Sequence, residues 1–156
     1  MPDPRPTGHR FANTDPDVVI GNFPWYDMLW RSLRGDFKPQ REPQDGYAAF
    51  AQHWTQPMDH ARLAQRQTAP VITWLGHVST LLQVGGLNVL MDPTLASHAG
   101  PGGRLGAQRR VPAPLTPEQL PPIDVVLISH NHYDHLCDAT LGRLLKAGQT
   151  PQFVVP

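Results

Sequence analysis

The stretch VVLISHNHYDH at residues 125–135 decides most of what this sequence predicts. The apolar run at 125–129 has the length and the β-branched composition of a buried strand. Four side chains of metal-binding type follow it directly: His130, His132, Asp134 and His135. In α/β proteins, functional side chains gather beyond the carboxyl ends of strands. We therefore predict a metal site at the end of this strand rather than a solvated histidine-rich loop.

The spacing divides these four side chains into two pairs. On an extended backbone, residues i and i+2 point to the same side, so His130 and His132 can hold one ion together. Asp134 and His135 are neighbours, and they can share a second ion only if the backbone turns there, as it would between a strand and a helix. Imidazole and carboxylate ligands suit zinc first, with manganese and iron left open. The pattern predicts two adjacent ions, taken here as Zn²⁺.

A β-hairpin is predicted upstream of the metal motif. Residues 71–75 and 78–84 have the composition of strands, and residues 87–91 form the returning strand. Gly85 and Gly86 between the last two segments suit a tight turn with positive φ. The segments at 26–33 and 46–55 are predicted short helices, and so is 139–147, which Asp138 would cap. A last strand begins at residue 153.

The metal motif resembles that of the metallo-β-lactamase-fold hydrolases. The segments WLGHVSTLLQ at 74–83 and GGLNVLMDP at 85–93 resemble the first hairpin of one branch of that superfamily. This branch contains N-acyl-phosphatidylethanolamine-hydrolysing phospholipase D and its bacterial relatives, and it lies near the ascorbate-phosphate lactonases. The resemblance implies an α/β fold in which residues 70–156 are the N-terminal half of an αββα sandwich. Residues 1–69, rich in proline and aromatic side chains, would form an arm that packs on this domain.

The resemblance also implies a role for each site residue. His130 and His132 would bind the first metal, and Asp134 and His135 would bind the second and belong to the catalytic machinery. Asp92 would support the metal loop by accepting a hydrogen bond from a ligand histidine, with a plain Asp-Pro turn as the alternative. For His77, which follows Gly76, pocket lining, substrate contact and a structural hydrogen bond stay open.

The activity implied is that of a metal-dependent hydrolase, most specifically a phospholipase-D-like phosphodiesterase that uses a dinuclear metal-activated hydroxide. A sugar-phosphate lactonase and a non-catalytic metal-binding or interaction fragment are the alternatives. Family members are longer and take further ligands from a second half that is not found in this sequence. We therefore expect the chain to be a fragment, or one component completed by another polypeptide, and to be inactive alone.

Composition narrows the expected partners. Lys and Arg together number 13, as do Asp and Glu, so no net charge favours nucleic acid or an anionic membrane. A small molecule or a phospholipid is the expected substrate, and peripheral membrane contact through the aromatic arm stays open, as does the oligomeric state. Arg104, Arg109 and Arg110 cluster in a long connection at 94–122 and could face either phosphate or solvent. With Cys137 as the one cysteine and no membrane-spanning run, we predict a cytoplasmic protein.

Overall fold

The computed structural model of the chain describes residues 25–35 and 43–156. The chain divides into two compact units, Met1–Arg41 and Glu42–Pro156. The described element of the first unit is helix α1 (Trp25–Arg34), in which Asp27 and Arg31 pair across one turn at 3.0 Å. The helix predicted at 26–33 is therefore confirmed, with one more residue at each end. The division into residues 1–69 and 70–156 remains a prediction.

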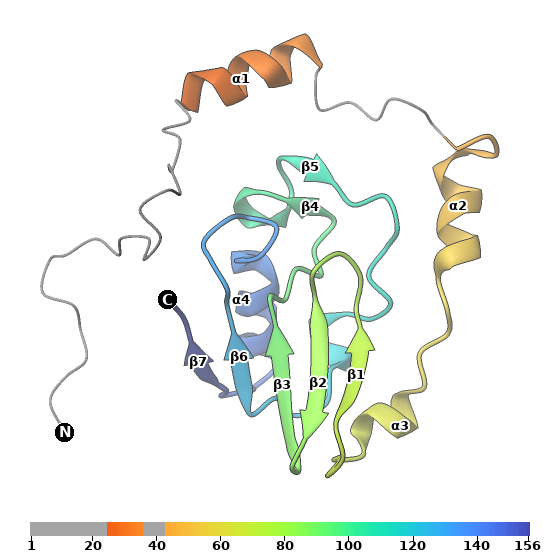
Figure 1. The fold of residues 1–156 in the computed structure, drawn as a ribbon, viewed down its shortest axis with the longest axis vertical. Helices are drawn as coiled ribbons and strands as arrows, with labels where there is room; N and C mark the ends of the chain where they lie inside the picture. Colours follow the sequence, from red (N-terminus) through yellow and green to blue (C-terminus); the bar gives the residue numbers. More distant parts are fainter. Residues whose placement is uncertain (1–24, 36–42) are drawn as a thin grey trace, which may run out of the picture. The chain divides into compact units, whose positions relative to one another are not determined.

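The second unit is built on a five-stranded sheet in the order β1-β2-β3-β6-β7 (Figure 1). Its strands are β1 (Val71–Trp74), β2 (Thr80–Val84), β3 (Leu87–Met91), β6 (Val125–Leu127) and β7 (Gln152–Val154). The first three strands form an antiparallel meander, and β3, β6 and β7 run parallel. Helix α4 (Asp138–Lys146) connects β6 to β7. This mixed α/β fold agrees with the predicted class, and each predicted strand is present, most of them one to two residues shorter.

Local chemistry explains the hairpin and the helix. Gly85 and Gly86 have φ of 59° and 80°, which is the conformation that a two-residue hairpin turn needs. Helix α4 has Cys137 as its N-cap, so the prediction that Asp138 caps the helix is wrong. The Asp138 carboxylate lies inside the first turn and accepts a hydrogen bond from the Ala139 N–H at 2.8 Å. Gly148, with φ of 83°, follows the end of the helix, as expected of a C-terminal glycine.

The hydrophobic core lies on one face of the sheet. Leu81, Leu90 and Val126 are neighbours across β2, β3 and β6, and all three are fully buried. Leu144 of α4 packs in the same cluster and is equally buried. The helix therefore covers this face, and its apolar side chains close the core beneath the strand that carries the metal motif.

A buried polar network anchors helix α3 (His60–Ala64) to the sheet. The Gln83 amide donates to the carbonyl oxygens of Leu63 and residue 65 and to the Asn88 side chain, at 2.9–3.1 Å. Asn88 in turn donates to the Pro122 carbonyl at 2.7 Å. No buried side-chain nitrogen or oxygen in the described part of the chain lacks a hydrogen-bond partner. The network thus fixes the position of α3, a helix that the sequence did not predict.

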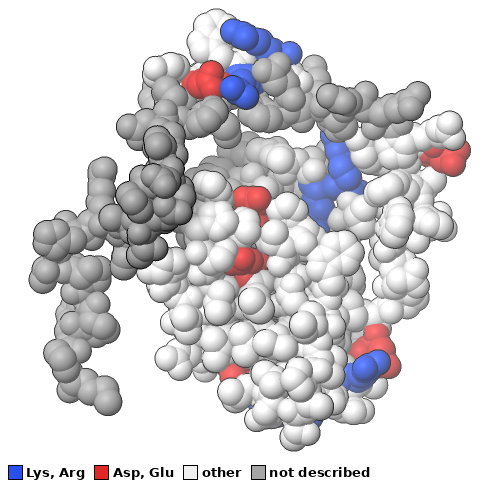
Figure 2. Space-filling view, in the orientation of Figure 1, with Lys and Arg blue, Asp and Glu red and all other residues white. Residues whose placement is uncertain are grey.

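The opposite face of the sheet is apolar and open. Ile72 and Trp74 in β1 are 71% and 67% exposed, and Val154 at the other edge is 45% exposed. Figure 2 shows almost no charged side chain over the strands on this face. Within residues 43–156, these side chains remain exposed. An exposed apolar surface of this kind marks a site of contact with another surface or a tendency to self-associate.

Helix α2 (Gly46–Trp54) forms where a helix was predicted, and none of its residues is buried. That residues 1–69 pack on the domain as an arm remains a prediction. Residues 94–122 are not structureless, because they hold the hairpin of β4 (His98–Ala99) and β5 (Ala107–Gln108) and two 3₁₀ turns, η1 (Pro101–Gly103) and η2 (Pro117–Gln119). These elements are too short for a periodic pattern to reveal them.

Candidate metal site

The metal motif occupies a tight turn at the carboxyl end of β6. The strand ends at Leu127, two residues earlier than predicted. The backbone then folds back, because the His132 carbonyl oxygen accepts hydrogen bonds from the N–H groups of His135 and Leu136 at 2.9 and 2.7 Å. This turn lies where the sequence required one, and it returns His135 toward the histidines that precede it.

His130 and His132 approach each other through their ring nitrogens. Nε2 of His130 lies 3.1 Å from Nδ1 of His132, and the ring centroids are 4.6 Å apart. Two nitrogens bound at about 2.0–2.1 Å to one tetrahedral zinc ion would be roughly 3.3 Å apart. The observed separation is therefore compatible with one ion held between the two imidazoles.

Asp134 and His135 form the second pair. Nε2 of His135 is 3.8 Å from Oδ2 of Asp134. The same carboxylate oxygen is 3.2 Å from Nε2 of His77, while the Asp134 carbonyl accepts from the Thr94 hydroxyl at 2.9 Å. Burial acts to raise the pKa of Asp134, but the hydrogen bond with His77 and the nearby imidazoles outweigh it, so the pKa lies below its ordinary value. The carboxylate is thus kept ionised, as a metal ligand must be.

The two pairs lie next to each other. The rings of His130 and His135 have centroids 3.8 Å apart. The Ser129 hydroxyl is 3.0 Å from Nδ1 of His130 and 3.1 Å from Nδ1 of His135, so one small side chain contacts a member of each pair. Ser129 was not among the predicted site residues, although its place directly before the first histidine was a usable signal.

Asp92 lies behind the motif and holds it in place. Its two carboxylate oxygens accept from the Ser129 N–H and the Ser129 hydroxyl, both at 2.7 Å, and Oδ2 is 2.9 Å from Nδ1 of His135. Burial acts to raise the pKa of Asp92, but these hydrogen bonds outweigh it and hold the pKa below its ordinary value. Since Nδ1 of His135 faces a carboxylate, it carries the proton, and Nε2 is left as the acceptor nitrogen.

His77 and Asp92 share an unusual backbone conformation. Their φ values are 53° and 42°, in the left-handed region that residues other than glycine rarely adopt. The His77 turn is fixed by the Trp74 indole, whose N–H donates to the His77 carbonyl oxygen at 2.8 Å. Residues held in this conformation cluster at functional sites, where the surrounding structure maintains them. Both of them contact the second ligand pair.

The donor atoms of the two pairs are of the kinds that bind a divalent metal. Imidazole nitrogens and an ionised carboxylate are the ligands that zinc and its neighbours take. Within residues 25–35 and 43–156, no three His, Cys, Asp or Glu side chains are arranged to enclose one ion. The described residues thus offer two donors to each ion, fewer than the three that a catalytic zinc usually takes from protein.

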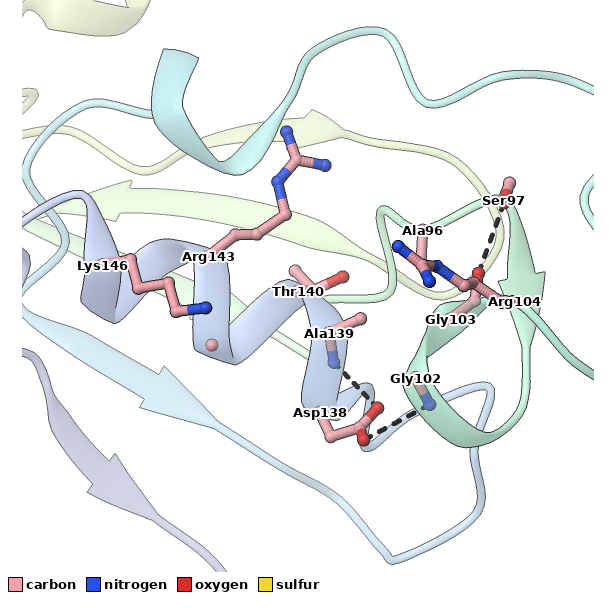
Figure 3. A pocket seen from close by; sticks show the side chains of 11 residues that line it. Ala96, Ser97, Gly102, Gly103, Arg104, Asp138, Ala139, Thr140, Arg143 and Lys146 are labelled. Carbon is pink, nitrogen blue, oxygen red and sulfur yellow. Dashed lines mark hydrogen bonds between the residues drawn. The ribbon is translucent and has the colours of Figure 1, made fainter.

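A pocket of about 460 Å³ lies between α4 and the turn η1 (Figure 3). Arg104, Arg143, Lys146 and Asp138 are its charged lining residues. Arg143 is paired with Glu118 through two hydrogen bonds of 2.8 and 2.6 Å. The pocket contains none of the six predicted site residues, so it is separate from the metal motif.

Comparison with known proteins identifies the class. A family model described as a beta-lactamase superfamily domain matches residues 71–154, which include both ligand pairs, His77 and Asp92. The chain belongs to this family. The match spans the whole five-stranded sheet and α4, so the fold and the motif are recognised together.

Three relatives give the family context. An uncharacterized protein of Mycobacterium tuberculosis is 40% identical over 85 residues, which are 54% of this chain and 23% of the relative. N-acyl-phosphatidylethanolamine-hydrolyzing phospholipase D 1 of Caenorhabditis elegans is 34% identical over 84 residues, 54% of this chain and 24% of the relative. A UPF0173 metal-dependent hydrolase of Methanopyrus kandleri is 38% identical over 68 residues, 44% of this chain and 24% of the relative. The similarity thus spans about a quarter of each relative's length.

None of the helices in the described part of the chain has the length and apolar character of a membrane-spanning segment.

Proposed function

We propose that this chain carries one half of the metal centre of a metal-dependent hydrolase, and that the enzyme is a phospholipase-D-like phosphodiesterase. One observation carries the proposal. Four side chains from a single turn converge as two adjacent donor pairs, and Asp92 fixes the proton of His135 on the nitrogen that faces away from Asp134. The names of the relatives from Methanopyrus kandleri and Caenorhabditis elegans support the hydrolase and the phosphodiesterase respectively.

Each residue has a distinct part in this proposal. His130 and His132 would hold one ion, and Asp134 and His135 the other, with zinc as the proposed metal. Bound ions of this kind supply positive charge for an anionic substrate and lower the pKa of water. Asp92 orients His135, and His77 holds the Asp134 carboxylate. The chain's own contribution is therefore to position ligands and keep them in the correct protonation state.

The proposed substrate is a phospholipid or a smaller phosphodiester. The apolar open face of the sheet and the exposed aromatic side chains of α2 are compatible with peripheral contact with a lipid surface. We propose a cytoplasmic location, since the one cysteine, Cys137, is free and buried. With two donors for each ion among the described residues, we propose that these 156 residues alone do not turn over substrate.

The ligand assignment is tested in the polypeptide that the complete gene encodes. His130→Ala and His132→Ala should each lower the zinc content, measured by mass spectrometry of the purified protein, and should nearly abolish hydrolysis of bis-p-nitrophenyl phosphate. His98→Ala, outside the cluster, is the matched control and should change neither quantity. Unchanged metal content and activity in both motif variants would reject the assignment. Strong lactone hydrolysis without diesterase activity would instead favour a lactonase.

A further inference from the structure

We propose that Arg109 is a positioning residue of the metal site, which ties together the two segments that hold Asp134. The inference rests on the proposed metal-binding function. Asp134 is contacted from two sides, by the His77 imidazole at its carboxylate and by the Thr94 hydroxyl at its carbonyl oxygen. Arg109 touches the backbone of both supporting segments, although it lies 25 positions before Asp134 in the sequence.

The first contact runs through Thr94. The Arg109 guanidinium donates from Nη2 to the Thr94 carbonyl oxygen. Thr94 is therefore held at its carbonyl by Arg109, at its N–H by the Ser79 hydroxyl at 2.8 Å, and donates its own hydroxyl to Asp134. With both backbone groups fixed, the hydroxyl has little freedom to move away from the metal loop.

The second contact runs through Gly76. A Cβ added at Gly76 would lie 2.8 Å from Nη1 of Arg109, so the guanidinium packs directly against the bare Cα. Gly76 also has φ of 92°, and it immediately precedes His77 with its φ of 53°. Glycine adopts this conformation without strain, and a larger residue here would have to displace the Arg109 guanidinium. The guanidinium thereby supports the turn that presents the His77 imidazole to Asp134.

The β4–β5 hairpin determines where Arg109 lies. The Arg109 N–H donates to the Ser97 carbonyl oxygen at 2.8 Å, which continues the ladder one step beyond His98 and Gln108. At the closed end of the hairpin, a Cβ on Gly100 would collide with the Leu105 carbonyl oxygen. The hairpin thus brings Arg109 back to Thr94, and Gly100 is needed because a side chain there would clash with the backbone across the hairpin.

The burial of Arg109 separates it from the other arginines of this connection. Burial lowers the pKa of the Arg109 guanidinium, and among the described residues no carboxylate pairs with it. Arg109 is half-buried, and a partly desolvated cation without a counterion is unfavourable, so a solvated-loop role does not explain its position. Arg110, the next residue, instead covers the Tyr47 ring at 4.5 Å from the centroid and is exposed. It is a matched control of the same chemical type.

The test measures Co²⁺ binding and local exchange in the 156-residue chain fused to maltose-binding protein for solubility. Arg109→Met should lower the affinity for the second Co²⁺ by about 10- to 100-fold and alter its visible absorption, as loss of an outer support typically does. Arg109→Lys should recover part of the affinity, because a single ammonium can still donate to Thr94. Gly100→Ala should reproduce the Arg109→Met effect, and Arg110→Met should leave both affinity and spectrum unchanged.

Hydrogen–deuterium exchange of the metal-free protein supplies a second readout. Peptides covering 74–79 and 129–136 should exchange faster in Arg109→Met, while the core strands at 81–90 keep their wild-type rates. Equal acceleration everywhere would show a merely structural role and overturn the proposal, as would wild-type Co²⁺ affinity in Arg109→Met. A wild-type chain that takes up no Co²⁺ would show that the two donor pairs do not hold ions by themselves, and it would overturn the proposed role of Arg109 in this chain.

Discussion

Asp92→Asn should uncouple the folding of the motif turn from its capacity to bind metal. Asparagine keeps one oxygen and can still accept from the Ser129 N–H, which now bonds to Oδ1. The atom that replaces Oδ2 becomes an amide donor facing the Ser129 hydroxyl and Nδ1 of His135. His135 can satisfy that donor only by moving its proton from Nδ1 to Nε2. Nε2, the nitrogen that would bind the metal, would then carry a proton.

The structure allows the size of both effects to be estimated. The His135 and Asp92 side chains are only 18% and 13% exposed, so solvent screens their interaction little. A hydrogen bond to a charged group contributes about 1.5–3 kcal/mol and a neutral one about 0.5–1.5 kcal/mol. Replacing the carboxylate by an amide should therefore cost about 1 kcal/mol of stability for each of the two altered bonds. We expect the free energy of unfolding to fall by about 2 kcal/mol. Metal affinity should fall about 10- to 100-fold, which corresponds to about 1.4–2.7 kcal/mol.

The assay uses the maltose-binding-protein fusion. Pulse proteolysis across a urea series gives the unfolding free energy of the domain, and competition with a chromophoric chelator gives zinc affinity. Ser129→Ala is the control, because it removes the hydroxyl that bonds to Asp92 and contacts His130 and His135 but leaves the carboxylate facing His135. It should cost about 1 kcal/mol in stability and much less in metal affinity than Asp92→Asn. The reasoning is refuted if both variants lose stability equally and Asp92→Asn binds zinc as tightly as the wild type.

Three further predictions concern the scaffold. Asn88→Ala should lower the unfolding free energy by about 1–3 kcal/mol, since it removes the hydrogen bonds that Asn88 makes to the Gln83 amide and the Pro122 carbonyl oxygen, and the same proteolysis assay checks this. The Arg143 hydrogen bonds hold the pKa of Glu118 at about 2, below its ordinary 4.5. The stabilisation that they give is therefore complete above pH 4.5 and is lost as the pH falls toward 2. Glu118→Gln should flatten this part of the acid-unfolding curve. The chain without its fusion partner should self-associate through the open sheet face. The double substitution Ile72→Lys with Trp74→Lys should shift its sedimentation toward that of a monomer. Unchanged association would place the contact elsewhere.

Local signals in the sequence were sufficient for the strands of the sheet and for the close approach of the four motif side chains, whose role as metal ligands remains a prediction. The glycine pair at 85–86 and the apolar runs around it specify a hairpin by backbone conformation and alternation alone. The i, i+2 histidines and the turn after them are likewise local. The motif therefore appears where it was predicted, even though its backbone leaves the strand two residues early.

The unpredicted parts depend on contacts between distant residues. Helix α3 has five residues, too few for a periodic pattern, and is anchored by Gln83 and Asn88 from the sheet. Arg109 stood in a cluster of three arginines with nothing to separate it from its neighbours. Its contacts with Gly76 and Thr94 arise only once the β4–β5 hairpin has formed. The exposure of the aromatic side chains Phe50 and Trp54 in α2 was equally hidden, since a helical pattern shows which side chains share a face but not what covers that face.

The position of β6 in the sheet has a consequence for the order of folding. Strands β1 to β3 are contiguous and can pair through short turns, whereas β6 pairs in parallel with β3 only after residues 92–124 have closed a long loop. Loop closure of this kind is entropically slow, and parallel pairing forms late. The motif histidines are neighbours in sequence from the start, whereas Asp92 contacts His135 only after β6 has paired with β3. Ligand geometry is a property of the last step of assembly, so an ion bound there would be expected to retard unfolding rather than to initiate folding.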